Sequence, residues 1–176
     1  MTLIEFHRLS PLATLPTKND GDAGYDLYAA EDAVLLPGSR QLISTGISVN
    51  LAALQEQRHL WPSRYFTPVG IIKDRSGVSS KTGLHCMAGV IDRDYTGEIK
   101  VLMVNLNLTE LTDVGSYNQG VFDWMNYNHM HTVRIEKGQK IAQMVVTLAY
   151  DGGIQASMVP FKNELRGDNG FGSTGK

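Results

Sequence analysis

The chain has 176 residues, of which 42% are hydrophobic, enough for one domain with a core of its own. Its net charge of -2 at pH 7 excludes the basic surface that nucleic-acid polymers require, and its apolar runs are too short to cross a membrane. Since there is no secretory leader and Cys86 is the only cysteine, we expect a soluble, cytoplasmic protein without an intrachain disulfide. Cys86 itself is expected to be a small, half-buried residue rather than a nucleophile.

Short runs of β-forming residues recur along the chain, with turn residues between them. They cover residues 3–9, 33–36, 40–43, 47–51, 69–73, 98–106, 131–135 and 141–149. Helical pattern is limited to 52–60, with a single further turn at 78–81. We therefore predict one all-β domain over residues 1–165 and a mobile C-terminal arm over 166–176.

The stretch 107–130 has no clean period, and we expect it to be inserted between two strands. It is rich in large apolar side chains, namely Tyr117, Phe122, Trp124, Met125, Tyr127 and Met130. Such side chains either pack the insertion onto the domain or form a contact surface for another protein. His129 and His131 could share a face as metal ligands, but ordinary surface histidines are favoured because no third ligand lies nearby.

Three polar segments adjoin the predicted strands. Arg75-Ser76-Gly77 follows the run 69–73, and its guanidinium, hydroxyl and amide N–H groups could converge on an anion. Ser76 could equally cap a short helical turn, so both interpretations stay open. The segment 22–29 is an acidic turn that leads into a strand, and its Asp26 would suit a water molecule of hydrated Mg²⁺. The turn at 138–140 leads into a buried strand containing Gln143.

Residues 89–98 place two carboxylates and a tyrosine together in one segment. Asp92 and Asp94 would point the same way if the backbone were extended, but a turn here would separate them. A hairpin with polar turn residues is the simpler interpretation. The functional interpretation is that a carboxylate able to orient water lies three residues from Tyr95, which could lie flat against a sugar ring.

The last eleven residues contain four glycines and a single large apolar side chain, Phe171, so they cannot fold by themselves. Arg166, Ser173 and Thr174 suit phosphate oxygens, and Phe171 suits a flat base, which indicates a nucleotide as the ordering ligand. The alternative is an ordinary frayed terminus. Residues 170–176 also spell most of a P-loop, which is excluded because no Ser or Thr and no helix follow Lys176.

Five segments, in this order, resemble the five motifs of the trimeric dUTPase family. They are A-G-Y-D-L-Y-A from Ala23, R-S-G-V-S-S-K from Arg75, G-V-I-D-R-D-Y-T-G-E from Gly89, G-Q-K-I-A-Q from Gly138 and R-G-D-N-G-F-G-S-T-G from Arg166. The resemblance implies a jelly-roll-like β-barrel with a short helical element and a flexible C-terminal arm. It also implies a homotrimer whose active sites are shared between subunits, with each arm reaching a neighbour's site.

The activity that the resemblance implies is the hydrolysis of dUTP to dUMP and pyrophosphate with Mg²⁺, which lowers dUTP and supplies dUMP for thymidylate synthesis. Asp92 matches the aspartate that activates the attacking water, and Asp26 would hold Mg²⁺ through a water molecule. The substrate-binding residues that it implies are Arg75, Ser76, Gly77, Ala88, Gly89, Tyr95, Gln143, Arg166, Phe171, Gly172, Ser173 and Thr174.

The chain departs from the family pattern in a few places. Asp74 stands where the family usually has proline, which would put a negative charge beside a polyphosphate site unless the side chain points away. Asn169 replaces a frequent glycine of the arm. The stretches 52–65 and 107–130 are longer than the usual connections, as in some phage or viral dUTPases in which an extra segment before the fourth motif contacts other proteins; for a viral protein the expected compartment is the host cytosol.

Two alternative functions remain open from the sequence. The first is a dCTP deaminase of the same fold, which would need a general base, usually Glu, beside the cytosine amine. The second is a nucleotide-gated regulatory protein that binds a partner through the insertion at 107–130. Asp92 followed by Asp94 and Tyr95 favours the diphosphatase over the deaminase.

Overall fold

The computed structural model describes residues 4–54, 59, 61, 64–107 and 131–154. Strands dominate this part of the chain, so the all-β prediction is confirmed. The strands are β1 (Glu5–Arg8), β2 (Tyr25–Tyr28), β3 (Ala33–Leu35), β4 (Arg40–Ser44), β5 (Ile47–Asn50), β6 (Phe66–Asp74), β7 (Leu84–Met87), β8 (Val90–Ile91), β9 (Lys100–Asn105), β10 (Val133–Ile135) and β11 (Lys140–Tyr150). The helix α1 (Ser76–Thr82) lies between β6 and β7.

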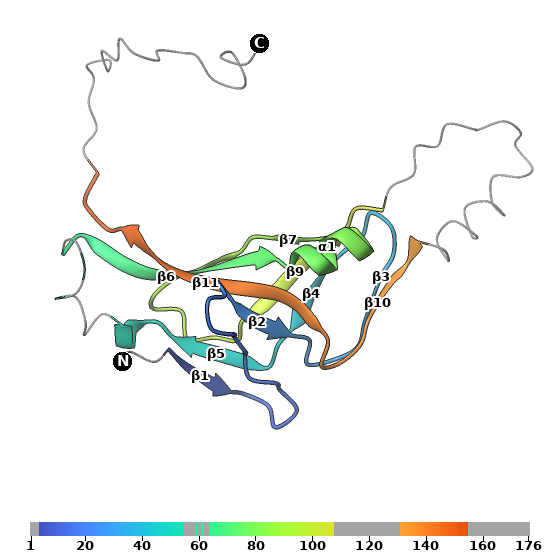
Figure 1. Ribbon diagram of the computed structural model, residues 1–176, viewed down its shortest axis with the longest axis horizontal. Coiled ribbons are helices and arrows are strands. Elements are labelled where there is room, and N and C mark those ends of the chain that lie inside the picture. Colours follow the sequence, from blue (N-terminus) through green and yellow to red (C-terminus); the bar gives the residue numbers. More distant parts are fainter. Residues whose placement is uncertain (1–3, 55–58, 60, 62–63, 108–130, 155–176) are drawn as a thin grey trace, which may run out of the picture.

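Among the described residues, all strand pairs are antiparallel and form four sheets. The larger sheets have the strand orders β2-β11-β6-β8 and β4-β9-β7, and the smaller ones are the pairs β1-β5 and β10-β3. β6 and β11 are the longest strands and run side by side along the long axis of the molecule (Figure 1). Their pairing extends from Ala142 opposite Asp74 to Tyr150 opposite Phe66.

The core lies between the two larger sheets. Along β9 every second residue, beginning with Val101, is buried, as expected for a strand with one face on the core. The other sheet contributes buried side chains from β2, β6 and β11 to the same cluster. Fully buried members from the two sheets include Leu27, Ile43, Val101, Met103, Ile141 and Met144.

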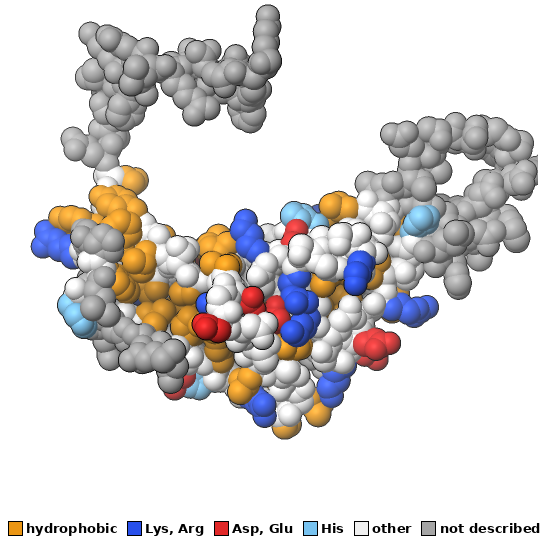
Figure 2. All heavy atoms as spheres, viewed as in Figure 1, with side chains coloured by type: hydrophobic (Ala, Val, Ile, Leu, Met, Phe, Trp, Pro, Cys, Tyr) orange, Lys and Arg blue, Asp and Glu red, His pale blue; other side chains and the backbone are white. Residues whose placement is uncertain are grey.

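Aromatic side chains gather where β6 begins and β11 ends. The rings of Phe66 and Tyr65 lie 6.1 and 6.3 Å from the ring of Tyr150. Figure 2 shows hydrophobic side chains exposed on this end of the molecule, whereas charged side chains gather near the middle of the same face. The apolar end is therefore distinct from the middle of this face, although a Lys or Arg side chain also projects from it (Figure 2).

Some elements differ from the sequence prediction. β6 is longer than the predicted run 69–73, because β11 pairs with it over its whole length. The predicted helix at 52–60 is described only as a short 3₁₀ turn at 52–54, and most of its remainder lies outside the described residues. α1 extends the single turn expected at 78–81. No helix among the described residues is long and apolar enough to cross a membrane.

A buried asparagine joins the residues that flank 108–130. The side-chain amide of Asn105 donates to the carbonyl oxygens of Leu35 and His131, at 3.0 and 2.9 Å. Its Oδ1 accepts the backbone N–H of Asn107 at 3.0 Å. Asn105 is fully buried, and these three bonds satisfy the polar atoms that its burial removes from water. The end of β9 and the start of β10 are thus held together by one side chain.

We expect Leu35→Ala to lower the free energy of unfolding by about 2–5 kcal/mol, because Leu35 is fully buried and its removal leaves a cavity. Val34→Ala, one residue earlier on the exposed face of β3, should cost much less. Urea unfolding of both variants measures the difference. Equal losses would contradict the assignment of the core face.

Candidate active site

The turn between β6 and α1 builds the first part of the site. Arg75 occupies the N-cap position of α1 in an extended conformation, and its carbonyl oxygen accepts the N–H groups of Val78 and Ser79. The cap position belongs to Arg75, so the capping interpretation of Ser76 is wrong. Ser76 and Gly77 instead line a cavity together with Arg75.

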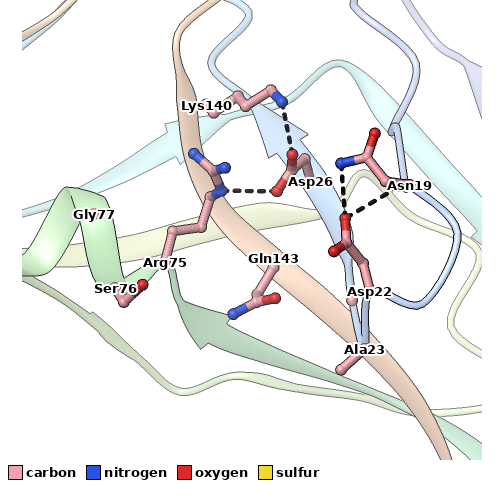
Figure 3. Close-up of a pocket in the computed structure, with 10 residues that line it drawn as sticks. Asn19, Asp22, Ala23, Asp26, Arg75, Ser76, Gly77, Lys140 and Gln143 are labelled. Carbon is pink, nitrogen blue, oxygen red and sulfur yellow. Dashed lines mark hydrogen bonds and ion pairs between the residues drawn. The ribbon is translucent and has the colours of Figure 1, made fainter.

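This cavity has a volume of about 310 Å³ and is named here the phosphate-side cavity. It is formed by the loop before β2, by β2 itself, by the β6–α1 turn and by β11 (Figure 3). Its lining is predominantly polar and consists of Asn19, Asp22, Ala23, Gly24, Asp26, Arg75, Ser76, Gly77, Lys140 and Gln143. The structure therefore brings together five of the residues expected from the sequence, namely Asp26, Arg75, Ser76, Gly77 and Gln143.

Asp26 holds two cations in this cavity. Its Oδ1 lies 2.7 Å from Nε of Arg75, and its Oδ2 lies 2.8 Å from Nζ of Lys140 (Figure 3). Only 15% of the Asp26 side chain is exposed, whereas both cations remain partly accessible to a ligand. The hydrogen bond to Asp26 raises the pKa of Lys140, so this side chain stays charged.

Lys140 is a site residue that sequence reasoning missed. It could have been suspected from the sequence, because it lies in the segment G-Q-K-I-A-Q, three residues before Gln143. The ion pair with Asp26 became visible only when β2 and β11 were seen to pair.

Gln143 is placed by two neighbours. Its Nε2 donates to the backbone oxygen of Asp74 at 2.8 Å. A Cβ added to Gly24 would lie 2.7 Å from Oε1 of Gln143, so a larger residue would push the Gln143 side chain out of this position. Gly24 thus leaves room for Gln143, which faces the cavity from β11.

Asp92 and Tyr95 lie on a turn after β8. The N–H of Tyr95 donates to the carbonyl oxygen of Asp92 at 3.1 Å, which closes the turn. Asp94 binds Arg93 through both carboxylate oxygens, at 2.8 and 2.6 Å, and the hydrogen bond from Arg93 lowers the pKa of Asp94. Asp92 is exposed and makes no such bond with the described residues. The turn separates the two carboxylates, as expected, and leaves Asp92 available.

Asp92 and Tyr95 line a second cavity, of about 240 Å³, which is named here the nucleoside-side cavity. Tyr95 is held across it because its hydroxyl donates to the backbone oxygen of Glu98 at 2.8 Å. The lining combines apolar side chains with charged ones and comprises Leu42, Val90, Ile91, Asp92, Tyr95, Glu98 and Lys100. Arg75, Ser76, Gly77 and Gln143 do not line this cavity. The predicted site residues of one chain therefore fall into two separate groups.

The turn between β7 and β8 carries Ala88 and Gly89. Ala88 has φ of 48°, a left-handed conformation that is uncommon for a residue with a side chain. Gly89 lies so close to β6 that an added Cβ would be 2.5 Å from the backbone oxygen of Ile72. Its own carbonyl oxygen accepts the N–H of Ile72 at 2.6 Å. The hairpin is thereby fixed against β6.

Asp74 points away from the phosphate-side cavity. Its Oδ1 accepts the N–H of Cys86, and its Oδ2 lies against Nδ1 of His85, both at 2.6 Å. The repulsion considered from the sequence is therefore avoided by the direction of the side chain. Partial burial opposes its charge, but the hydrogen bonds from the Cys86 backbone and from His85 bring the pKa of Asp74 below its ordinary value.

Cys86 is half-buried, as expected. Burial, together with its bond to Asp74, raises the pKa of Cys86 to about 12, so the thiol stays protonated at neutral pH. It is therefore not a nucleophile.

The remaining predicted residues cannot be placed. Arg166, Phe171, Gly172, Ser173, Thr174 and the arm at 166–176 lie outside the described residues, as do 108–130 and His129. Within the part of the chain that the structure describes, no group of three or more His, Cys, Asp or Glu side chains could hold a metal ion by itself.

We expect the stability of the protein to depend on pH through Asp74. A carboxylate whose pKa is lower in the folded than in the unfolded chain stabilises the fold above its unfolded pKa, and this contribution is lost as the pH falls through the folded pKa. Asp74→Asn should therefore lower the free energy of unfolding at pH 7. Below about pH 5, the free energy of unfolding should fall less steeply with decreasing pH in this variant than in the parent protein. Urea unfolding between pH 7 and pH 3 tests this, and parallel curves for both proteins would contradict it.

Comparison with known proteins identifies the family. The dUTPase family model matches residues 11–112 and 106–175, and its two matched segments meet at the start of the stretch 107–130. The deoxyuridine 5'-triphosphate nucleotidohydrolase of Corynebacterium diphtheriae is 34% identical over 99% of this chain and 93% of its own length. The enzyme of the same name from Saccharomyces cerevisiae is 31% identical over 94% of this chain and 90% of its own length.

Solved phage enzymes have the same fold. A variant of the Staphylococcus bacteriophage 80alpha dUTPase, solved with dUpNHpp, has a TM-score of 0.75 and 27% identity, with 100% of both chains covered. A variant of the dUTPase of phage phi11 of S. aureus, described with a structural Mg(II) ion, has a TM-score of 0.67 and 25% identity, over 92% of this chain and 100% of its own. The expected jelly-roll-like fold is confirmed, and the likeness to phage enzymes is consistent with an insertion before the fourth motif. Matched by the family model over most of its length and by relatives along nearly all of it, the chain belongs to the dUTPase family.

Proposed function

We propose that this protein hydrolyses dUTP to dUMP and pyrophosphate, which lowers dUTP and supplies dUMP for thymidylate synthesis. The observation that carries the proposal is the pair of cations that Asp26 holds in the phosphate-side cavity, which Ser76 and Gly77 also line. Arg75 and Lys140 are already oriented before a polyphosphate arrives, so little ordering remains to be done on binding. The 80alpha enzyme with dUpNHpp supports a deoxyuridine triphosphate as the ligand.

The residues of the chain suit attack by water at the α-phosphorus. Asp92 accepts a proton from the water as the water oxygen bonds to the α-phosphorus. The bond between the α-phosphorus and the oxygen that bridges to the β-phosphorus breaks, and pyrophosphate leaves. Charge that develops on the leaving phosphates is stabilised by Arg75 and Lys140. Tyr95, fixed by its bond to Glu98, provides a flat surface for the deoxyribose.

Mg²⁺ fits this site as an ion held by the substrate rather than by a protein cage. Mg²⁺ keeps several waters and usually binds through one or two carboxylates together with substrate phosphates. Asp26 has further lone pairs beyond its two ion pairs, and with Asp22 it places carboxylate oxygens beside the phosphate-side cavity. Asp26 would hold the ion through a water molecule, and when bound the ion would neutralise phosphate charge.

We further propose a homotrimer in which each active site combines residues from different subunits. The two groups of site residues line different cavities of one chain. One dUTP molecule would therefore contact the first group on one subunit and the second group on a neighbouring subunit. Arg166 would bind the terminal phosphate, Phe171 would cover uracil, and Gly172, Ser173 and Thr174 would wrap the phosphates from a neighbouring arm. The backbone of Ala88 and Gly89 would bind uracil, and Gln143 would reach the phosphates.

The alternatives have less support. The relatives and structures described above are dUTPases, so a dCTP deaminase is not favoured. A regulatory role through the insertion depends on 108–130, which lies outside the described residues. We propose that the main function is dUTP hydrolysis in the cytoplasm.

We expect Asp92→Asn to keep the affinity for dUpNHpp but to lower kcat for dUTP by about 10²–10⁴, because the water loses its proton acceptor while the geometry survives. Asp94→Asn is the matched control, since Asp94 is occupied by Arg93 and should retain most of the turnover. Pyrophosphate release from dUTP and ammonia release from dCTP are measured for both variants and the parent chain. Ammonia without pyrophosphate in the parent would overturn the proposed reaction.

Mixing two inactive variants tests the shared site. Asp92→Asn and Arg75→Ala chains each lack one part of every site, but a mixed trimer contains one site with both parts intact. Unfolding and refolding a 1:1 mixture should restore about a quarter of the parent activity if subunits assort at random. A mixture no more active than its components, or a monomer in analytical ultracentrifugation, would contradict the shared site.

A further inference from the structure

The side chain of Asp74 links the two larger sheets. Asp74 is the last residue of β6, in the sheet β2-β11-β6-β8, whereas His85 and Cys86 belong to β7, in the sheet β4-β9-β7. Both carboxylate oxygens of Asp74 reach β7 at 2.6 Å. The side chain is 29% exposed, so these charge-assisted bonds are partly shielded from water.

The backbone of Asp74 is held from the opposite side. Asp74 pairs with Ala142 of β11, and its carbonyl oxygen accepts Nε2 of Gln143 at 2.8 Å. The next residue is Arg75, from which α1 and the phosphate-side cavity begin. Asp74 is thus fixed by its main chain and its side chain directly before the cation that faces the phosphates.

The strand that receives the carboxylate leads to the second group of site residues, which lines the nucleoside-side cavity. β7 continues through Ala88 and Gly89 into β8 and then into the turn that carries Asp92. Val90 lines both the nucleoside-side cavity and the cavity that contains Asp74 and His85. Any movement of β7 against β6 therefore changes the relation between Arg75 and the hairpin.

We propose that Asp74, bound to Cys86 N–H and paired with His85, is a positioning residue that fixes the direction of Arg75 toward the polyphosphate. The inference rests on the proposed function. Asp74 does not line the phosphate-side cavity, so it acts through Arg75 and Gln143 and not on the substrate. Without the Asp74 carboxylate, the end of β6 loses its hydrogen bonds to β7, and Arg75 at the start of α1 becomes less ordered. Binding of the polyphosphate must then also order Arg75, which weakens the affinity.

Binding of dUpNHpp and of dUMP, measured by calorimetry with the full chain, separates positioning from general destabilisation. Asp74→Ala should weaken dUpNHpp by about tenfold, which corresponds to the loss of about one charge-assisted hydrogen bond. Binding of dUMP, which lacks the two outer phosphates, should change by less than about twofold. Asp74→Asn should stay within about threefold for dUpNHpp, because its amide oxygen still accepts Cys86 N–H.

Glu5→Ala is the matched control, since Glu5 also binds a histidine and an amide N–H, on β1. It should leave both affinities unchanged. If Asp74→Ala fails to fold, His85→Ala keeps the test open, because it removes one of the two partners and should weaken dUpNHpp by about threefold.

Unchanged dUpNHpp binding in Asp74→Ala and His85→Ala would overturn the inference, as would an equal loss for dUMP and dUpNHpp or a loss in Asp74→Asn as large as in Asp74→Ala. Hydrolysis of dUTP by the parent chain is measured in the same preparation. A parent chain that binds but does not hydrolyse dUTP contradicts the proposed function, whereas an active parent with unaffected variants contradicts only the role of Asp74.

Discussion

The register between β6 and β11 determines where Asp74, Arg75 and Gln143 lie relative to one another, and with them part of the proposed phosphate site. Because side chains alternate along a strand, a slip of one residue would turn Gln143 away from the cavity and Met144 away from the core. The same register sets Ala142 opposite Asp74, so that Arg75 leaves the sheet beside β11. Gly24 then lets Gln143 fill the space next to β2. Backbone pairing, not local sequence, makes these distant segments neighbours.

The electrostatics of the site follow from this arrangement. Two cations would repel each other at the edge of a sheet, but Asp26 lies between them and compensates part of their charge. The trio keeps one net positive charge and accessible N–H donors for an anion. On the turn after β8, Arg93 forms an ion pair with Asp94, so that Asp92 is the carboxylate that remains available beside Tyr95. Each group of site residues thus contains or adjoins one carboxylate that is paired with a cation, Asp26 in the first and Asp94 beside the second. The N–H donors of Arg75 and Lys140 and the carboxylate of Asp92 remain available to a ligand.

Sequence reasoning predicted the all-β class and most strands, because alternating burial such as that of β9 leaves a local pattern. It did not delimit β7 and β8, which are too short for a period. The resemblance identified Arg75 and Gln143, whereas Lys140 and the direction of Asp74 depend on contacts between strands far apart in the chain. A helix at 52–60 was expected from composition, yet its described part is a 3₁₀ turn after a buried strand.

Asn105 has a consequence for how this fold can vary. Its side chain ties Asn107 and His131 to the same point, so the domain is closed there independently of what connects them. Closing a connection costs little more when it is longer, about 0.6 kcal/mol for each doubling of its length. Selection can therefore lengthen, shorten or replace the segment between these residues without altering the core or either half of the site. New surface properties can be acquired at this position while the chemistry of the enzyme is inherited unchanged.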